Sequence, residues 1–312
     1  MRIAVTGSTG FIGSHLIPAL LHAGHEVTAV SEAGQKGELE EVKAIPVDVT
    51  TGEGLEEVFL GADAVIHLAA RNHVLKDMAA DPLAEYRRVN VEGTQHAVRA
   101  AIAAGTKTFL HFSSVKTMGE GSDAVLDEES VCAPKTPYGI SKLESEEAVR
   151  TIAAGSGMHA AILRLPMVYG PRNRGNFPRL IWWARKGLPF PLFQPDNLRS
   201  MVYVGNVVAG VMTLLKRPPE GVSTYILKDS EDYSTRRVYS AVCHELRTTP
   251  RFVPVPAVAT RIGGLFSEDL RKLAGSFRVS SAKIEKEIGF IPPFSFDEGV
   301  ARTVRWSRNS VL

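Results

Sequence analysis

The chain has 312 residues, with 36 basic against 34 acidic side chains and two cysteines. This length allows one large α/β unit or two lobes. The charge is nearly balanced and contains no block of one sign, which argues against nucleic acid or an anionic membrane surface as the main partner. Cys132 and Cys243 are far apart and match no metal-ligand spacing, so free thiols in a reducing compartment are expected.

Neither a signal peptide nor a membrane span is expected. Met1 and Arg2 lead directly into the apolar run Ile3–Val5, which leaves no room for the parts of a signal peptide. The nearly uncharged stretch at residues 201–215 is shorter than the roughly 20 residues that a spanning helix needs. These features predict a soluble, cytoplasmic protein.

Short β-branched runs alternate with helical patterns through the first half of the chain. Strands are expected at residues 3–6, 27–30, 44–49, 64–68, 108–112 and 160–165. Helices are expected at residues 12–21 (ended by Gly24), 86–104 and 137–154. Alternating strands and helices with apolar strands favour a parallel sheet covered on both faces.

The alternation breaks after about Gly170. Prolines and glycines punctuate the chain from there to Pro195. Helical patterns then recur between shorter strands, at residues 205–215, 235–247 and 257–274. We expect a smaller lobe here, mixed with the last strands of the sheet, and packed in part by Trp182 and Trp183.

Three glycines, Gly7, Gly10 and Gly13, lie between the first expected strand and the first expected helix. Strand, glycine turn and helix together form the context of a dinucleotide-binding fingerprint. Gly7 would allow the tight turn, Gly10 the close approach of a pyrophosphate, and Gly13 the packing of helix on strand. The free N–H groups of the helix start would then face the phosphates.

Tyr138 and Lys142 carry the strongest catalytic signal. They are four residues apart in an expected helix, so they share one face. A nearby ammonium is expected to lower the phenol pKa from its usual value near 10, which would make Tyr138 a general base near neutral pH. Ser113 and Ser114 follow the strand at residues 108–112 and would lie at the same edge of the sheet.

The spacing Thr6-Gly7-x-x-Gly10-x-x-Gly13 resembles the extended short-chain dehydrogenase/reductase family, which includes nucleotide-sugar epimerases and dehydratases. The resemblance continues through most of the chain, in Asp48-Val49, His67-Leu68-Ala69-Ala70, Asn90-Val91-Glu92-Gly93-Thr94, Pro137-Tyr138-Gly139-Ile140-Ser141-Lys142 and Arg164–Pro171. It implies a Rossmann-type, doubly wound parallel sheet. Residues 1–170 would bind NAD(P), with some later segments returning to the sheet, and residues 171–312 would form mainly a substrate-binding lobe.

The resemblance also implies roles for individual residues. Catalysis is assigned to Ser114, Tyr138 and Lys142. Cofactor contacts are assigned to Gly7, Thr9, Gly10, Phe11, Ile12, Gly13, Ser31, Asp48, Val49, Leu68, Ala69, Ala70, Asn90, Ser113, Tyr138 and Lys142. Substrate contacts are assigned to Ser114, Tyr138, Asn176, Phe177 and Arg199, with a further phosphate cation near Arg271 or Lys272. No metal is expected, and His67, His73 and His111 are interpreted as structural.

The end of the second expected strand bears on the choice of cofactor. Ser31 occupies the position that faces the adenosine ribose, Glu32 follows it, and the first cation is Lys36. A carboxylate near this position favours NAD, whereas an arginine would favour the phosphate of NADP. We therefore expect NAD, with NADP not excluded.

Two departures from the family pattern narrow the substrate. Val115-Lys116 stands where the family's dehydratases have Asp-Glu, which disfavours a sugar dehydratase, and Met167 replaces an asparagine that often contacts the substrate diphosphate. The resemblance favours a 4-epimerase of a UDP-hexose, of the UDP-glucose or UDP-N-acetylglucosamine type. An NAD(P)H-dependent reductase of a UDP-4-keto-6-deoxy sugar remains an alternative, and a catalytically inactive dinucleotide-binding regulator is a more remote one. By analogy, a homodimer would form through the helices at 86–104 and 137–154.

Overall fold

The computed structural model describes residues 1–32, 42–72, 79–173, 175–192, 197–255 and 275–309. The helix expected at 257–274 lies outside the described residues, as do Lys36, His73, Arg271 and Lys272. Within the described ranges, no helix has the length and apolar character needed to cross a bilayer.

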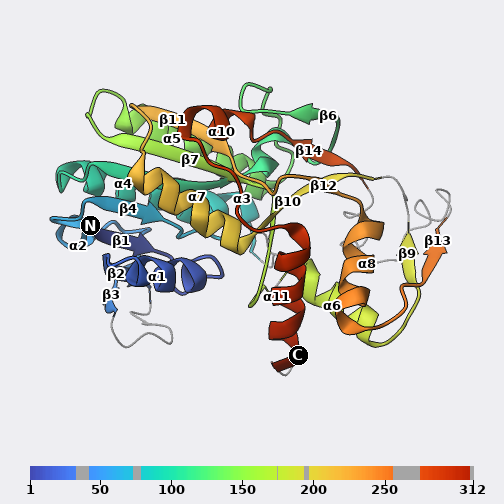
Figure 1. Ribbon diagram of the computed structural model, residues 1–312. Helices are drawn as coiled ribbons and strands as arrows, with labels where there is room; N and C mark the ends of the chain where they lie inside the picture. Colours follow the sequence, from blue (N-terminus) through green and yellow to red (C-terminus); the bar gives the residue numbers. More distant parts are fainter. Residues whose placement is uncertain (33–41, 73–78, 174, 193–196, 256–274, 310–312) are drawn as a thin grey trace.

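A seven-stranded parallel sheet takes six strands from residues 2–165 and its last strand from residues 222–226 (Figure 1). Its strands are β1 (Arg2–Thr6), β2 (Glu26–Ser31), β3 (Lys43–Pro46), β4 (Ala64–His67), β5 (Thr108–Ser114), β7 (His159–Leu165) and β11 (Val222–Ile226). Their spatial order is β11-β7-β5-β4-β1-β2-β3, so the chain winds outward from β1 and then returns through β4. The predicted doubly wound fold is confirmed, and so are the six predicted strands, although β3 stops three residues before the predicted end at residue 49.

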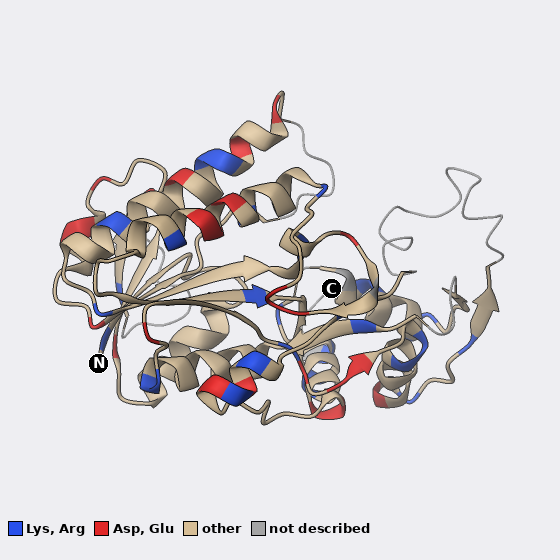
Figure 2. Ribbon diagram, turned by 90° about the horizontal axis from the view of Figure 1, so that it is seen from above, with Lys and Arg blue, Asp and Glu red and all other residues tan. Residues whose placement is uncertain are grey.

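Helices cover both faces of this sheet (Figure 1). On one face, α1 (Gly13–His22), α7 (Val204–Lys216) and α10 (Ala282–Ile288) pack on inward residues such as Ile3 and Val5. On the other, α2 (Leu55–Phe59), α4 (Gly93–Ala103) and α5 (Pro137–Ala153) pack on Ala4, Val65 and Phe109. The strands carry almost no charge, and the charged residues lie on the helices and at strand ends (Figure 2). Burial on both faces explains these apolar strands.

The helix predicted at 86–104 is interrupted. It begins earlier, as α3 (Pro82–Arg87), because the Asp81 side chain accepts a hydrogen bond from the Ala84 N–H and Pro82 suits a first turn. A wide π turn, η1 (Arg88–Glu92), then joins α3 to α4. Such turns insert one extra residue into the ladder. The turn contains Asn90, which is completely buried.

A smaller sheet and a second core occupy the rest of the molecule (Figure 1). The small sheet has the order β12-β10-β14-β6, with β8 paired to β10. Its strands are β6 (Ser122–Leu126), β8 (Met167–Tyr169), β10 (Arg199–Tyr203), β12 (Asp232–Tyr233) and β14 (Phe277–Val279). Beside it lie a two-stranded ribbon and three helices: β9 (Phe190–Leu192), β13 (Phe252–Pro254), α6 (Asn176–Arg185), α8 (Thr235–Leu246) and α11 (Phe296–Asn309). Trp183 packs against this core as expected, whereas Trp182 is 49% exposed.

Asp229 joins the two cores. Its buried carboxylate accepts hydrogen bonds from the Tyr169 hydroxyl at 2.9 Å, the Tyr203 backbone N–H at 2.9 Å and the Asn206 amide at 2.7 Å. Tyr169 belongs to the second core, whereas Asn206 lies on α7, which packs on the large sheet. Burial raises the pKa of Asp229, and its three donors oppose that rise. This one side chain therefore holds the start of α7 to the small sheet.

We expect Asp229→Ala to lower the free energy of unfolding by about 3–5 kcal/mol, because three buried donors lose their acceptor at once. Urea unfolding measures the loss. Asp297→Ala is the control, since Asp297 forms an ion pair with Arg237 at 2.7 Å in which both side chains are exposed. Its loss should stay below about 1 kcal/mol. Equal losses for the two variants would contradict the role of Asp229 as a joint.

Candidate active site

The glycine turn between β1 and α1 is shaped by backbone contacts. Gly7 has φ +65°, and a Cβ there would lie 2.6 Å from the backbone nitrogen of Ala69. A Cβ on Gly13 would lie 2.3 Å from the carbonyl oxygen of Ser8. At Gly10 a Cβ would meet only the Gly7 oxygen, at 3.1 Å, so no other described part of the protein packs against this position. The turn therefore packs tightly against β4 and α1 but leaves backbone open at Gly10.

The start of α1 is suited to an anion. No side chain caps the helix, and its first turn contains no acidic residue. The N–H groups at the start of a helix carry a partial positive charge. Those of Ser14 and His15 donate to the carbonyls of Gly10 and Ile12, so a pyrophosphate beside Gly10 would meet the N–H groups that precede Ser14.

A cavity of about 410 Å³ opens beside this turn and runs along the carboxyl ends of β1, β4, β5 and β7. Many of the predicted residues line it: Gly7, Gly10, Phe11, Ile12, Gly13, Leu68, Ala70, Ser113, Ser114, Tyr138 and Lys142. The lining also includes residues that the sequence interpretation did not assign: Asn72, Phe112, Leu165, Pro166, Val168, Asn173 and Gly175. Several of these belong to segments already singled out, and their position after β4, β5 or β7 was the available signal.

Ser114 and Tyr138 are brought together by a close helix contact. Ser114 ends β5 and caps the short 3₁₀ helix η2 (Val115–Met118), where its hydroxyl accepts the Lys116 N–H at 3.2 Å. The first turn of α5 is capped by Thr136, and a Cβ on Gly139 would lie 2.6 Å from the Lys116 carbonyl oxygen. This approach sets Tyr138 beside Ser114, and the two side chains are hydrogen-bonded.

The electrostatics of Tyr138 and Lys142 differ from the sequence expectation. Burial raises the pKa of Tyr138 to about 12, and the bond from Ser114 opposes only part of that rise. Burial also lowers the pKa of Lys142 to about 8, with the charge of Glu146 opposing the change. The predicted lowering of the phenol pKa is therefore wrong for the protein alone, because desolvation raises the pKa more than the bond from Ser114 lowers it.

Two buried histidines lie near Lys142. His67 contacts Thr6 at 2.8 Å and Thr94 at 3.1 Å, and His111 contacts Ser145 at 2.9 Å. Their rings stack at 5.7 Å. Burial and the Lys142 charge lower the pKa of His67 to about 3 and that of His111 well below its usual value, so both are neutral. These bonds support a structural role, and the described residues contain no cluster of His, Cys, Asp and Glu that could hold a metal.

Asn90 lies behind the cavity wall. Its side-chain oxygen accepts the Arg71 N–H at 2.8 Å, and its amide donates to the Arg71 carbonyl at 3.2 Å and to the Ser141 hydroxyl at 2.9 Å. It is not among the described residues that line the cavity. The amide thus joins the segment after β4 to the turn of α5 between Tyr138 and Lys142, and its predicted contact with the cofactor stays a prediction.

The predicted adenosine contacts lie at the same edge of the sheet, outside the cavity lining. Ser31 ends β2, and the following Glu32 is exposed. Asp48 follows β3, and its carboxylate accepts the Thr50 N–H at 2.8 Å, which lowers its pKa. Val49 packs under Gly93. Thr9 and Ala69 adjoin lining residues without being among them.

The predicted substrate contacts Phe177 and Arg199 do not line the described cavity. The ring of Phe177 is buried in the second core and stacks on Tyr169 at 5.2 Å, so a substrate contact of this residue stays a prediction for its backbone. The side chain of Asn176 lies outside the described part of the structure. Arg199, on β10, donates to the Gly275 carbonyl at 2.7 Å and does not line the described cavity. Burial lowers the pKa of Arg199, with the charge of Glu120 opposing.

Comparison with known proteins gives consistent matches. Residues 3–227 match the model of the NAD dependent epimerase/dehydratase family. The chain is 33% identical to a UDP-glucose 4-epimerase of Vibrio cholerae, over 97% of this chain and 94% of the relative. It is 26% identical to a dTDP-glucose 4,6-dehydratase of Streptomyces griseus, over 98% of this chain and 93% of the relative. Among solved structures, MoeE5 in complex with UDP-glucose and NAD aligns with a TM-score of 0.82 and 27% identity, over 99% of both chains.

The buried ammonium of Lys142 predicts a pH-dependent stability. A lysine whose pKa falls from 10.5 to about 8 on folding destabilises the native state below pH 8, and this penalty disappears as pH rises toward 10.5. The Lys142→Met variant has no such group to titrate. Its free energy of unfolding, compared with that of the original protein at the same pH, should therefore fall by on the order of 3 kcal/mol as the pH rises from 8 to 10.5. Urea unfolding between pH 7 and 10.5 measures it. A difference independent of pH would show that Lys142 keeps an ordinary pKa.

Proposed function

The chain belongs to the NAD-dependent epimerase/dehydratase family, and from this we propose that it is a 4-epimerase acting on a UDP-hexose of the UDP-glucose or UDP-N-acetylglucosamine type. The observation that carries the proposal is the convergence of Ser114, Tyr138 and Lys142 on the cavity that the glycine turn borders. The identity of 33% to a UDP-glucose 4-epimerase over almost the whole chain supports the same reaction.

NAD is the cofactor of the family, and the residues of this chain fit it. The open backbone at Gly10 and the uncapped start of α1 suit a pyrophosphate. Asp48, after β3, would contact adenine, and Ser31, followed by Glu32, would face the ribose. Ser113, Tyr138 and Lys142 would border the nicotinamide end. Bound NAD supplies a hydride acceptor for the sugar and adds the positive charge of its nicotinamide ring.

In the proposed reaction, Tyr138 is the general base at the C4 hydroxyl. Ser114 is already hydrogen-bonded to Tyr138, so a sugar hydroxyl between them would be held for proton transfer. Lys142 contributes a positive charge on the same face of α5, which favours the phenolate against the cost of burial. The proton taken by Tyr138 returns to the same oxygen when the 4-keto sugar is reduced on its opposite face. The reaction therefore needs no net oxidant.

A dehydratase is disfavoured by the residues that follow Ser114. Elimination of water needs an acid and a base in addition to the Tyr138 pair. Val115 is apolar and 4% exposed, and Lys116 is paired with Glu120 at 2.5 Å. Neither offers the carboxyl groups that the dehydratase relatives are expected to use here. The 26% identity to a dTDP-glucose 4,6-dehydratase reflects the shared family more than this reaction.

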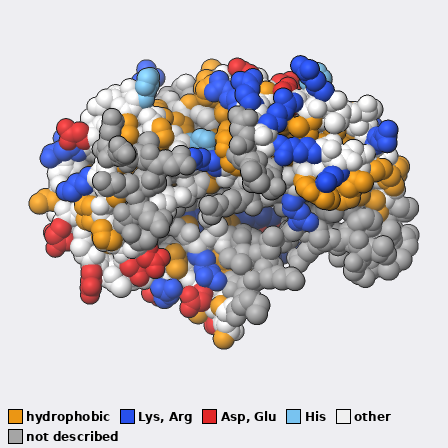
Figure 3. Space-filling view, turned by 90° about the horizontal axis from the view of Figure 1, so that it is seen from below, with side chains coloured by type: hydrophobic (Ala, Val, Ile, Leu, Met, Phe, Trp, Pro, Cys, Tyr) orange, Lys and Arg blue, Asp and Glu red, His pale blue; other side chains and the backbone are white. Residues whose placement is uncertain are grey.

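The substrate diphosphate is proposed to bind in the second half of the molecule, with Arg199 as its main charged contact and Asn176 beside it. The chain carries no Asp or Glu between Glu147 and Asp196. Lys and Arg side chains gather over the right half of the face in Figure 3, where acidic ones are few. Such a surface attracts anions such as nucleotide diphosphates.

We also propose a homodimer and a cytoplasmic location. Helices α4 and α5 pack side by side over one face of the sheet and together offer a broad surface to a second copy (Figure 1). The described cysteines, Cys132 and Cys243, are free thiols, as expected in a reducing compartment. Light scattering of the purified protein measures the mass and tests the dimer.

The reaction is tested by incubating the purified protein with UDP-glucose, UDP-N-acetylglucosamine or a UDP-4-keto-6-deoxy sugar, and by identifying the products by NMR. A C4 epimer formed without added NADH supports the proposal. Consumption of NADH equimolar with a keto sugar would identify the reductase instead. Release of NAD on denaturation, with no turnover of any sugar, would identify a regulator.

Tyr138→Phe should lower kcat by two or more orders of magnitude, because the general base is removed while the ring remains. NAD affinity and the unfolding midpoint should change little. Tyr225→Phe is the matched control, since its hydroxyl bonds Glu287 at 2.9 Å at the edge of the sheet. Activity of Tyr138→Phe within tenfold of the original protein would remove Tyr138 from the mechanism.

Arg199→Ala should raise KM for the UDP-sugar by about tenfold to a hundredfold, the loss expected from one charge-assisted contact of about 1.5–3 kcal/mol. The value of kcat should change little if the contact is equal in the ground and transition states. Arg278→Ala is the control, because Arg278 lies on the neighbouring β14 and pairs with Asp232 at 3.0 Å. An unchanged KM, or a loss confined to NAD binding, would mean that the diphosphate binds elsewhere.

A further inference from the structure

Arg164 brings a charge into the interior of the large sheet. In its seven strands, all of them described, the other charged residues are the first residues of β1, β2 and β3. Arg164 is the sixth residue of β7 and is 3% exposed. A guanidinium at such a position requires a carboxylate. That carboxylate is Glu146 of α5, whose side chain is completely buried.

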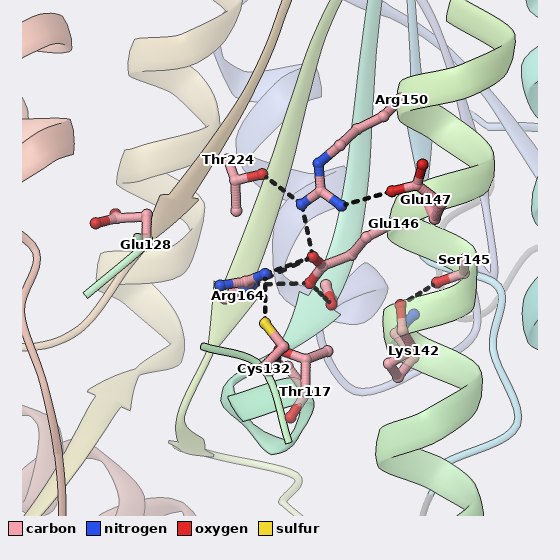
Figure 4. A network of polar contacts seen from close by, with 12 residues as sticks. Thr117, Glu128, Cys132, Lys142, Ser145, Glu146, Glu147, Arg150, Arg164 and Thr224 are labelled. Atoms are coloured by element: carbon pink, nitrogen blue, oxygen red, sulfur yellow. Dashed lines mark hydrogen bonds and ion pairs between the residues drawn. The ribbon is translucent and has the colours of Figure 1, made fainter. Parts of the chain in front are cut away.

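Glu146 is the centre of a polar network (Figure 4). Arg164 donates from Nε to Oε1 at 3.0 Å and from Nη2 to Oε2 at 2.8 Å. Arg150, one turn further along α5, donates to Oε2 at 2.8 Å. The hydroxyl of Ser113 donates to Oε1 at 2.5 Å. The network thus connects α5 to the ends of β5 and β7.

Two further contacts extend the network outward. Nη2 of Arg164 lies 3.2 Å from the sulfur of Cys132, in the loop before α5, and Arg150 donates to Thr224 of β11 at 3.0 Å (Figure 4). Arg164 and Arg150 therefore each have a second anchor. In each arginine it is Nη2 that makes both contacts, so this nitrogen is held between the Glu146 carboxylate and a second group.

The protonation state of Glu146 decides what Ser113 can do. Burial alone would raise the pKa of Glu146, but the bonds from Arg164, Ser113 and Arg150 hold it below its usual value. An ionised carboxylate can only accept hydrogen bonds. Ser113 has a single hydroxyl proton, and it is donated to Glu146. Toward the cavity, which Ser113 lines, the hydroxyl offers lone pairs alone.

We propose that Glu146, backed by Arg164, is a positioning residue that fixes the Ser113 hydroxyl as an acceptor toward the bound dinucleotide and places a negative charge one helical turn from Lys142. The groups that such an acceptor fits are N–H and O–H donors, which the carboxamide and ribose of a nicotinamide nucleotide carry. The assignment of Lys142 as a catalytic residue rests on the proposed function. The contacts of Ser113 do not.

The effect on Lys142 follows from the groups around it. Tyr138 and Glu146 lie on its own helix, His67 faces it from β4, and His111 faces it from β5. Both histidines are neutral and Tyr138 is protonated at neutral pH in the protein alone. Arg150 and Arg164 share the Glu146 carboxylate, but the charge that favours the Lys142 ammonium is that of Glu146. Without it, Lys142 would lose its proton at lower pH.

The test uses the double variant Glu146→Gln/Arg164→Met, because Glu146→Gln alone would leave the buried guanidinium uncompensated. The titration of Lys142 is followed by ¹³C NMR of lysines labelled at Cε, with the signal assigned through Lys142→Met. The midpoint of the Lys142 titration should move down by about one pH unit. NAD affinity, measured by calorimetry, should weaken about fivefold to tenfold. Ser113→Ala should give the same loss of affinity and leave the Lys142 titration in place.

Arg87→Met/Glu144→Gln is the matched control. This pair also joins a glutamate of α5 to an arginine, at 2.6 Å, but its side chains are 48% and 35% exposed. Neither the Lys142 titration nor the NAD affinity should change in this control variant. A folded Glu146→Gln/Arg164→Met variant with the original titration and affinity would reduce the pair to a structural role. If that variant does not fold, unchanged NAD affinity in Ser113→Ala overturns the proposal by itself.

Neither the Lys142 titration nor the NAD affinity requires a sugar substrate. If both measurements give the expected result but no UDP-hexose is converted, the proposed 4-epimerase is contradicted and the role of Glu146 stands. If UDP-hexoses are epimerised but the two measurements do not give the expected result, the role of Glu146 is contradicted and the 4-epimerase stands.

Discussion

The active-site geometry depends on the burial of a polar helix face. In its first three turns α5 buries Ser141, Lys142, Ser145 and Glu146 against the sheet, where a helix would ordinarily present apolar residues. Each buried polar group is destabilising unless a partner is supplied. Asn90 supplies one to Ser141, His111 to Ser145, and Arg164 to Glu146. Because these bonds weaken steeply outside a narrow range of distance and angle, they oppose sliding of the helix on the sheet and hold Tyr138 in place with it.

The large sheet and the shared helix face of Tyr138 and Lys142 could be predicted from the sequence because their signals are local. Strand, glycine turn and helix follow one another within residues 2–22, and the spacing of Tyr138 and Lys142 places them on one face of any helix. The 3.6-residue and 2-residue periods carry this information without knowledge of the partners. The same local signals predicted that Ser113 and Ser114 would follow a strand.

Properties that depend on distant partners could not be predicted. The phenol pKa of Tyr138 is set by how completely the fold excludes water from the side chain. The spacing of residues along the sequence carries no information about this. The amide of Asn90 is satisfied by Arg71 and Ser141, which are separated from it by 19 and 51 residues. Phe177 lies in a segment that was expected to contact the substrate, yet its ring belongs to an aromatic core assembled from Tyr169 and Phe296. Sequence patterns identify such side chains but not their neighbours.

The π turn at Arg88–Glu92 has a consequence for how this segment can vary. Each residue of an α-helix turns the following side chains by 100°, but the π turn holds one extra residue within a single turn, so α3 and α4 keep the phase of one continuous helix. Tyr86 therefore faces the protein before the turn, and Ala97, Val98 and Ala101 face it after. Removal of one residue here would give a regular helix in which the apolar stripe of α4 still faces the sheet, but the π turn that contains the buried Asn90 would be lost. A change of length by one residue can therefore be absorbed in this turn, whereas within α4 it would rotate every following side chain by 100°.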